Sequence, residues 1–424
     1  MTYKTTIDIA NPSNKKRSGY AQVNLESLGI PEELILQAKK QLLETKTTND
    51  FGLSLKDAKG DQVPYQIDHV FGSDLSHKGV LVIQCDNVDG MENNDDYKNK
   101  SISYVLTDNE SSTVKKPDNL LIEWYYGPQK PCEPYSLEPL TSKPLYGIKL
   151  CNGAIELFFS LKNKLDPDLD VCYTGSVTSI NHCQAPGDLT SPFKDIDDKP
   201  PWARWGQVTD IALFPTPWDV TWFTKIPLWD HEYELVYRKD GPVRSIASFR
   251  AGPFFMKYKG EPFFNEKINP VECYLYRILY AFPNQPFYFE QLVVLSKDGH
   301  SLSFRPYFLS VIPTLVKEQS SFNRFEHVPD YFAVWRSWAS LDIGYGFTSD
   351  SHIRGITIQG NDTRWRLQNS HMKTCIHAFN SVNGKLQDTK ERLKYIGDEW
   401  YEHIFKPLRP TPLSQTFNII PEDG

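Results

Sequence analysis

Tryptophans are concentrated in one stretch of this 424-residue chain, among charged side chains. Half of the ten tryptophans lie between residues 202 and 229, close to Asp219, Lys225, Asp230 and His231. The five are Trp202, Trp205, Trp218, Trp222 and Trp229. An indole ring covers the apolar C–H face of a sugar, while carboxylates and cationic groups bind its hydroxyls. The stretch therefore indicates a saccharide cleft; the alternative is that these tryptophans close the core at the ends of a large sheet.

Prolines interrupt the same stretch. They are Pro200, Pro201, Pro215, Pro217 and Pro227. Because proline removes a backbone donor, a long regular strand is not expected here. We therefore predict that the tryptophans lie on loops, as substrate-binding residues.

Two other places carry residue types that suit β-elimination from a uronic acid. That reaction needs a base for the C5 proton, an acid for the leaving oxygen and a cation for the carboxylate. The candidates are His182 or His352 as the base, Tyr173 or Tyr345 as the acid, and Arg204 or Arg336 as the carboxylate clamp. Gly344 and Gly346 are expected to form a close turn within the 336–354 stretch. A polysaccharide lyase is the first hypothesis.

Two alternatives use other residues or no catalysis. A glycoside hydrolase needs two carboxylates, ~5–5.5 Å apart for retention or ~6.5–9.5 Å for inversion, and Asp219 and Asp230 are the candidates. A glycan-binding protein would use the tryptophans only to hold ligand. The products separate the three hypotheses, because a lyase makes an ultraviolet-absorbing unsaturated uronate, a hydrolase makes only reducing ends, and a binder makes neither.

Cofactors find little support in the sequence. The seven cysteines are scattered without a CxxC pair, which is typical of buried free thiols in a reducing compartment. Asp166, Asp168 and Asp170 alternate as in a calcium loop, but the glycine and distal glutamate of an EF-hand are missing, so a solvated turn is preferred to a structural calcium site. His371 and His377 are six residues apart, which is poor spacing for a metal. No cofactor is expected.

Charge and hydropathy limit the partners. A formal charge of -7 argues against nucleic acid, because phosphate binding needs a basic face. No apolar run approaches the ~20 residues of a membrane span. The first residues lack a secretory signal, so a cytoplasmic location is expected unless the printed chain is a trimmed form.

The secondary-structure elements that must position these residues are predicted to be strands. Aromatic residues make up 13% of the chain and prolines number thirty, which favours an all-β protein. Strands are predicted at 80–85, 119–126, 154–161, 272–282 and 354–359. Hairpins are predicted in LSLKDAKGDQVPYQI, YELVYRKDGPVRSIASFR and EQLVVLSKDGHSLSFRPYFLSVI, where Lys-Asp and a glycine separate two strand-like runs. Two amphipathic stretches predict peripheral helices over 31–45 and 384–405.

A proline-rich segment over 128–144 marks the expected domain boundary. Residues 1–130 are predicted to form a smaller β-sandwich-like domain. Residues 131–424 are predicted to form a large antiparallel β-sandwich that carries the site.

Two patterns carry a resemblance to known proteins. The first is IDIANPSNKKRSGYAQVNL with the later LSLKDAKGDQVPYQIDHV, and the second is YELVYRKDGPVRSI. They resemble the β domains of α-mannosidase-like enzymes and of carbohydrate-active proteins with a mutarotase-like supersandwich, over residues 6–70 and 230–250. The resemblance implies a supersandwich fold and an oligo- or polysaccharide substrate, and it assigns no catalytic residue.

Overall fold

The structure is a computed structural model of the chain. It describes residues 3–72, 79–91, 100–108, 114–126, 145–161, 177–182, 204–213, 224–227, 233–256, 271–285, 287–311, 324–328, 331–338, 341–350, 353–359, 362–367, 372–382 and 408–411. The described residues form β strands with two helices, α1 (Leu25–Leu28) and α2 (Glu32–Thr45). No helix among them has the length and apolar character needed to cross a membrane.

The strands form four sheets. The four-stranded sheet has the order β24 (Arg409–Thr411), β1 (Lys4–Ala10), β6 (Ile102–Thr107), β3 (Ser54–Lys56), and the three-stranded sheet has the order β2 (Arg17–Asn24), β5 (Val80–Val88), β4 (Tyr65–Asp68). The nine-stranded sheet has the order β21 (Ile353–Gln359), β22 (Asp362–Leu367), β17 (Phe304–Val311), β11 (Arg204–Leu213), β10 (Val177–His182), β9 (Ile155–Ser160), β8 (Leu145–Cys151), β7 (Leu121–Tyr126), with β12 (Thr224–Pro227) paired to β11. The eight-stranded sheet has the order β13 (Tyr233–Asp240), β14 (Ser245–Met256), β15 (Val271–Ala281), β16 (Phe287–Ser296), β23 (Met372–Val382), β20 (Leu341–Ser349), β19 (Tyr331–Trp338), β18 (Arg324–Val328).

The chain divides into two compact units. The first comprises Met1–Leu120, Leu235–Ser248 and Asp398–Asn418, and the second comprises Leu121–Glu234, Phe249–Gly397 and Ile419–Gly424. Every described register between paired strands is antiparallel, which confirms the predicted all-β class.

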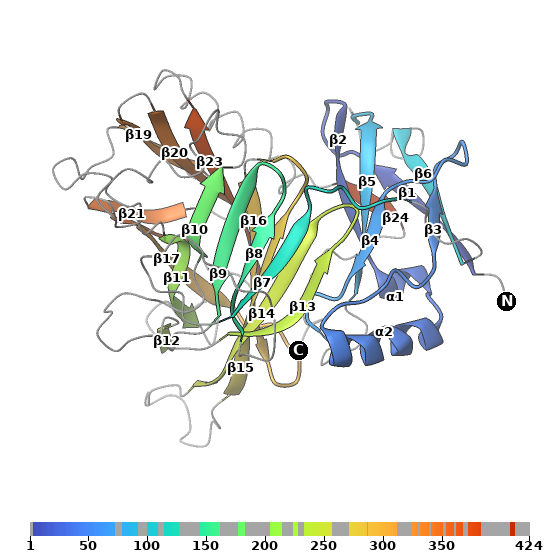
Figure 1. The fold of residues 1–424 in the computed structure, drawn as a ribbon, viewed down its shortest axis with the longest axis horizontal. Coiled ribbons are helices and arrows are strands. Elements are labelled where there is room, and N and C mark those ends of the chain that lie inside the picture. The colour runs from blue at the N-terminus through green and yellow to red at the C-terminus, as the bar shows by residue number, and fades with distance from the viewer. Residues whose placement is uncertain are drawn as a thin grey trace. The chain divides into compact units, whose positions relative to one another are not determined.

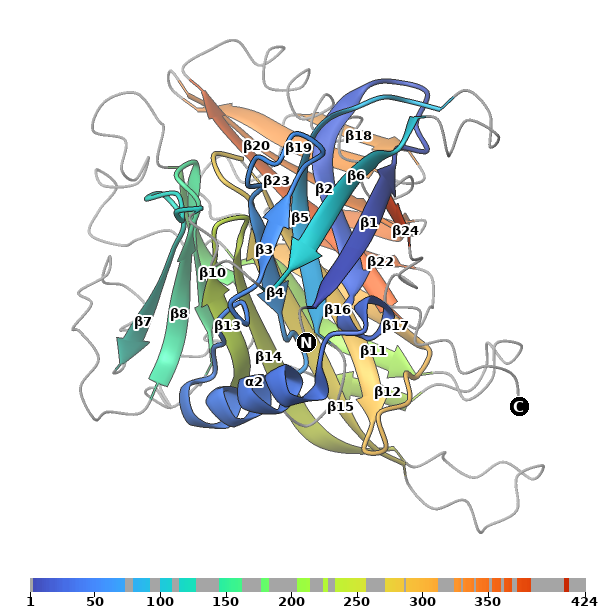
Figure 2. The same ribbon diagram turned by 90° about the vertical axis from the view of Figure 1, so that its right-hand side faces the viewer.

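The first unit is a small sandwich with a helix at one end of its strands (Figure 1). Its core takes alternate residues from both sheets, such as Ile7 and Leu106 on one and Val23 and Ile83 on the other. Figure 2 shows β1, β6 and β3 side by side, as their pairing requires. The predicted helix over 31–45 is confirmed as α2, which buries Ile35, Ala38 and Leu42. The predicted helix over 384–405 and the proline-rich 128–144 segment lie outside the described residues.

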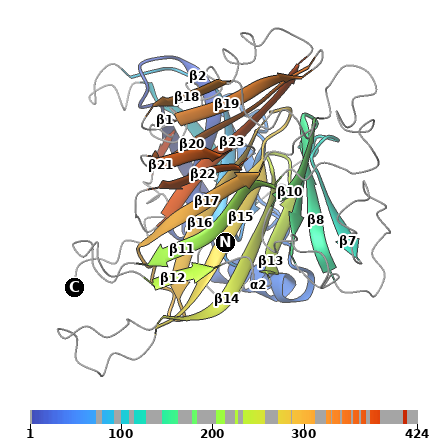
Figure 3. The same ribbon diagram turned by 90° about the vertical axis from the view of Figure 1, so that its left-hand side faces the viewer.

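The second unit is the large antiparallel sandwich expected from the sequence. Figure 3 shows β18, β19, β20 and β23 of its eight-stranded sheet running side by side. Phe159 on β9 stacks on Phe249 of β14, with ring centroids 4.2 Å apart, so the two large sheets pack face to face. The predicted strands near 80–85, 119–126, 154–161, 272–282 and 354–359 are confirmed as β5, β7, β9, β15 and β21.

Two of the three predicted hairpins are wrong. β3 pairs with β6 and β4 pairs with β5, so only a Lys56–Gln62 bridge joins the segments beside the turn. β16 and β17 likewise enter different sheets, and a Leu295–Ser301 bridge is all that joins them across their turn. The turn signals were correct, but each turn sends the chain from one sheet to the other, because burial against distant strands outweighs local pairing. β13 and β14 are neighbours, as predicted.

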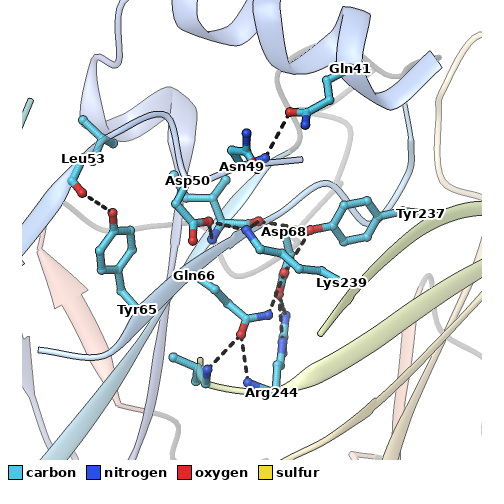
Figure 4. Close-up of polar contacts among 12 residues, drawn as sticks. Gln41, Asn49, Asp50, Leu53, Tyr65, Gln66, Asp68, Tyr237, Lys239 and Arg244 are labelled. Atoms are coloured by element: carbon cyan, nitrogen blue, oxygen red, sulfur yellow. Dashed lines mark hydrogen bonds and ion pairs between the residues drawn. The ribbon is translucent and has the colours of Figure 1, made fainter. Parts of the chain in front are cut away.

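The two sequence patterns that carry the resemblance meet inside the first unit (Figure 4). Gln66, from VPYQID, accepts hydrogen bonds from the backbone N–H groups of Val243 (3.0 Å) and Arg244 (2.8 Å), from GPVR. Asp68 accepts from Arg244 Nε at 2.9 Å and from its terminal nitrogen at 2.8 Å. All these side chains are buried. The patterns therefore encode one buried contact of the fold, which explains why they indicate architecture and name no reaction.

Candidate active site

Most of the site residues proposed from the sequence lie outside the described residues. They are Tyr173, Trp202, Trp218, Asp219, Trp222, Trp229, Asp230 and His352. Their grouping around a pocket, and their proposed roles in binding and catalysis, stay predictions. The candidate calcium residues Asp166, Asp168 and Asp170 are also outside the described part.

His182, Arg204 and Trp205 are placed on neighbouring strands. Trp205 pairs with Val177 within the ten-residue strand β11, so the prediction that it lies on a loop is wrong. The prolines flank this strand and do not enter it. His182 pairs with Ile155 at the other end of β10, five residues from Val177 or about 16 Å at the rise of a strand. The register therefore does not bring His182 and Arg204 together.

Arg336 and Tyr345 are brought close. In the β19–β20 pair Arg336 lies opposite Ile343 and Tyr345 lies opposite Val334, so the two are diagonal neighbours about 7–8 Å apart. Gly344 and Gly346 lie inside β20, where they pair with Trp335 and Ala333. The close turn predicted at these glycines is wrong, because both neighbours of β20 supply hydrogen bonds that keep it extended.

Sequence reasoning missed a buried group of charged residues on β15, β16 and β23. Arg277, Glu290 and His377 have no exposed surface. Arg277 donates from Nε to Glu290 Oε1 at 2.7 Å and forms an ion pair with the same carboxylate through its terminal nitrogen. His377 Nε2 lies 3.0 Å from Glu290 Oε2. One carboxylate thus holds an arginine on one oxygen and a histidine on the other; we call these three residues the inner cluster.

Aromatic rings enclose the inner cluster. Tyr288 stacks on the His377 ring, with centroids 4.7 Å apart and planes 6° from parallel. Phe347 meets the same ring edge-on at 5.2 Å. The guanidinium carbon of Arg277 lies 5.1 Å from the centre of the Phe159 ring, on the facing sheet. These apolar rings lower the local dielectric, which strengthens each charge interaction inside the cluster.

The charges of the inner cluster set its protonation. Burial acts to raise the pKa of Glu290, but Arg277 and His377 outweigh it and hold the pKa below its usual range. Burial lowers the pKa of His377, against the effect of Glu290. We therefore assign an ionised Glu290 and a neutral His377 that donates from Nε2.

Asp350 follows the last residue of β20, and its pKa is shifted in the opposite direction to that of Glu290. Its Oδ2 accepts from the backbone N–H of Thr374 at 2.9 Å, and its Oδ1 accepts from the Ser349 hydroxyl at 3.3 Å. Burial raises the pKa of Asp350 to about 6, although Lys373 and these hydrogen bonds act to lower it. Burial also lowers the pKa of Lys373 to about 8, with Asp350 acting in the other direction. Asp350 is only partly buried and so keeps some contact with solvent.

Strand register relates Asp350 to Glu290. Cys375 on β23 pairs with Glu290 on one side and with Ser349 on the other. The Cα atoms of Glu290 and Ser349 are therefore two strand spacings, or about 10 Å, apart, and Asp350 is the next residue. Asp350, whose pKa is raised to about 6, and the ionised Glu290 therefore lie on either side of the same strand. Two carboxyl groups with opposite pKa shifts suit acid–base catalysis.

One sequence signal could have found the inner cluster. Arg277 stands alone in CYLYRILYAF and Glu290 stands alone in FYFEQLVVL, each within an apolar strand. A charged residue in such a run must find a partner, because a buried unpaired charge is very costly. The described residues contain no group of histidine, cysteine and acidic side chains arranged to hold a metal ion.

Comparison with known proteins gave distant structural matches. No family model and no curated protein matches the sequence. An α-mannosidase from Enterococcus faecalis V583 is similar over 93% of this chain and 45% of its own length, with 10% identity and a TM-score of 0.42. A glycosyl hydrolase family 38 protein from Enterococcus faecalis is similar over 93% and 46%, with 10% identity and a TM-score of 0.41. A protein described as an aldose 1-epimerase from Escherichia coli K12 is similar over 55% of this chain and 98% of its own, with 8% identity and a TM-score of 0.24.

This chain spans less than half the length of the first two proteins. The likeness to these proteins is loose and partial.

Proposed function

We propose that the chain is a carbohydrate-active enzyme that hydrolyses glycosides, with Asp350 as the general acid and Glu290 as the general base. The observation that carries the proposal is the pair of carboxyl groups with opposite pKa shifts on either side of β23. Glycoside hydrolysis needs one protonated carboxyl group for the leaving oxygen and one ionised group for the attacking water. The aromatic stretch at 202–229 supports a sugar as the substrate.

The distance between the two carboxyl groups decides whether the anomeric centre is inverted or retained. Inverting enzymes hold their carboxyl groups ~6.5–9.5 Å apart, which leaves room for a water molecule, whereas retaining enzymes hold them ~5–5.5 Å apart. Glu290 is fully buried, so the proposal requires water to reach it past Tyr288 and His377.

A lyase is the second candidate, and one observation favours it. The diagonal placement of Arg336 and Tyr345 would put a cation and an acid near one substrate. Arg277 does not serve that purpose, because its charge is balanced by Glu290. Hydrolysis is preferred because Asp350 and Glu290 supply two carboxyl groups whose pKa values are shifted in opposite directions.

The test is Asp350→Asn, which removes the proposed acid and keeps its size. The matched control is Asp298→Asn, at an exposed position in the turn after β16. Both variants and the wild type are assayed on a panel of neutral and uronic-acid-containing oligosaccharides for new reducing ends and for ultraviolet absorbance. We expect reducing ends without absorbance from the wild type, a loss of at least about 100-fold for Asp350→Asn, and full activity for Asp298→Asn. Absorbance would instead support the lyase, and binding without products would support a glycan-binding protein.

A further inference from the structure

Residues 235–248 are held in the first unit by a buried polar network that is independent of the proposed catalytic residues. We call these residues the hairpin segment. Besides the Gln66 and Asp68 contacts with Arg244, Tyr237 donates from its hydroxyl to the Ile67 carbonyl at 3.1 Å, and Lys239 forms an ion pair with Asp50 (Figure 4). Gly241 packs so closely on Gln66 that a β-carbon there would collide with the carboxamide. The hairpin segment is therefore fixed by these side-chain contacts and by a backbone hydrogen bond from the Arg238 N–H to the Lys46 carbonyl at 2.8 Å, without strand pairing to β4.

His69 lies beside this network in a fully enclosed position. Its ring meets Phe51 edge-on at 5.9 Å and Tyr237 at 6.2 Å. A β-carbon at Gly79 would lie 3.0 and 3.1 Å from two atoms of the ring, so no space remains on that side. His69 Nε2 is buried and has no hydrogen-bond partner among the described residues. A proton on Nε2 would therefore find no acceptor among the described residues.

The charged groups around His69 oppose its protonation. Burial is the largest effect and, with Lys239 on β13 and Lys39 on α2, lowers the pKa of His69 to about 4, while Asp68 on β4 acts in the other direction. Asp68 is itself neutralised by Arg244, and Asp50 is engaged by Lys239. Tyr237, the remaining titratable group against the ring, is neutral, since burial raises its pKa well above the usual value.

We propose that the hairpin segment is an acid-released latch, which detaches from the first unit when His69 takes up a proton. The imidazolium would lie against Tyr237 and near Lys239, two side chains of the hairpin segment, so opening both solvates the new charge and separates it from Lys239. The direction in which pH changes the stability of the closed state follows from the pKa shift of His69. Because the folded pKa of about 4 lies below the free value of 6.5, the closed state is fully favoured above pH 6.5 and loses stability as the pH falls toward 4. From pH 7.5 to pH 5 the opening equilibrium should rise about 30-fold.

Hydrogen exchange of the full chain tests the latch. The reporters are the amides of Val243 and Arg244, which donate to the Gln66 side chain, and the reference is β5 in the core of the same unit. After correction for the intrinsic effect of pH, we expect the opening of the reporters to rise about 30-fold between pH 7.5 and pH 5, with β5 unchanged. Equal loss of protection in β5 would mean that the whole unit unfolds, and no change in the reporters would mean that the latch does not exist; either result overturns the proposal.

Substitution of His69 separates its proton from other effects of acid. His69→Phe keeps a flat ring between Phe51 and Tyr237 and should change opening less than 3-fold over the same pH range. His69→Gln, which also carries no titratable group, provides the same test if the phenylalanine variant does not fold. The matched control is His300→Phe, at an exposed turn position, which should keep the 30-fold response. An unaltered acid response in a folded His69 variant would refute the latch.

Discussion

Asp350→Asn should stabilise the second unit at high pH while it removes activity. The raised pKa means that the ionised carboxylate is less stable in the folded chain than in the unfolded one. A change from 3.8 to about 6 is about 2 pKa units, or about 3 kcal/mol at pH 8, where both states are ionised. Because Asp350 keeps some exposure to solvent, we expect a gain of about 1–3 kcal/mol in the free energy of unfolding.

The sign of the effect follows from the direction of the shift. A group whose folded pKa is raised favours the folded state below its unfolded pKa, and this advantage is lost as the pH rises through 6. Asparagine resembles the protonated carboxyl group: its oxygen can accept from the Thr374 N–H, and its amide can donate to the Ser349 hydroxyl. At pH 4 the gain should therefore shrink to about 0.5 kcal/mol.

Urea unfolding at pH 8 and pH 4 measures the effect. Tryptophan fluorescence reports on the second unit, because every tryptophan except Trp400 falls in its residue ranges. Asp298→Asn should change the free energy of unfolding by less than about 0.5 kcal/mol at either pH. An equal gain at both pH values, or a loss of stability at pH 8, would refute the reasoning that Asp350 is held in an unfavourable charge state.

Three further predictions concern neighbouring contacts. Lys373→Met removes a cation that lowers the pKa of Asp350, so the basic limb of the pH–activity profile should move to higher pH; an unmoved limb would exclude this coupling. Glu290→Gln leaves Arg277 buried without its carboxylate and should cost about 3–5 kcal/mol in urea unfolding, whereas a loss below 1 kcal/mol would contradict a dependence of the buried arginine on this ion pair. Gly241→Ala forces a methyl group against the fixed Gln66 carboxamide and should cost about 1–3 kcal/mol, measured by thermal melting, and an unchanged melting temperature would contradict the close packing.

The class of each element was available from the sequence. Aromatic and β-branched residues indicated strands, and β5, β9 and β15 lie within a few residues of their predicted bounds. The helix over 31–45 was found because Ile35, Ala38 and Leu42 recur at helical spacing on one face. Whether a segment forms a strand or a helix depends largely on residues a few positions away, so a local sequence pattern can predict it.

The partners of the strands were decided only by the tertiary structure. The turn after β16 has the residues of a hairpin, yet β16 pairs with β15 and β23, the latter more than 70 residues away in sequence. Both faces of β16 are buried, so its best partners are those that complete the cover of its side chains. A turn motif predicts that the chain changes direction. It does not predict which distant strand will pair with β16 and bury its side chains.

The candidate site shows the same division. The sequence by itself shows Arg277 and Glu290 each alone in an apolar run, where each must find a partner. Glu290 is 13 residues from Arg277 and 87 from His377, and only the registers of β15, β16 and β23 place the three on one carboxylate. Their protonation, and that of Asp350, follows from burial and from charges on other strands, because desolvation and Coulomb energy depend on distances in space. Residue types are a property of the sequence, whereas the charge that each carries at neutral pH is a property of the folded chain.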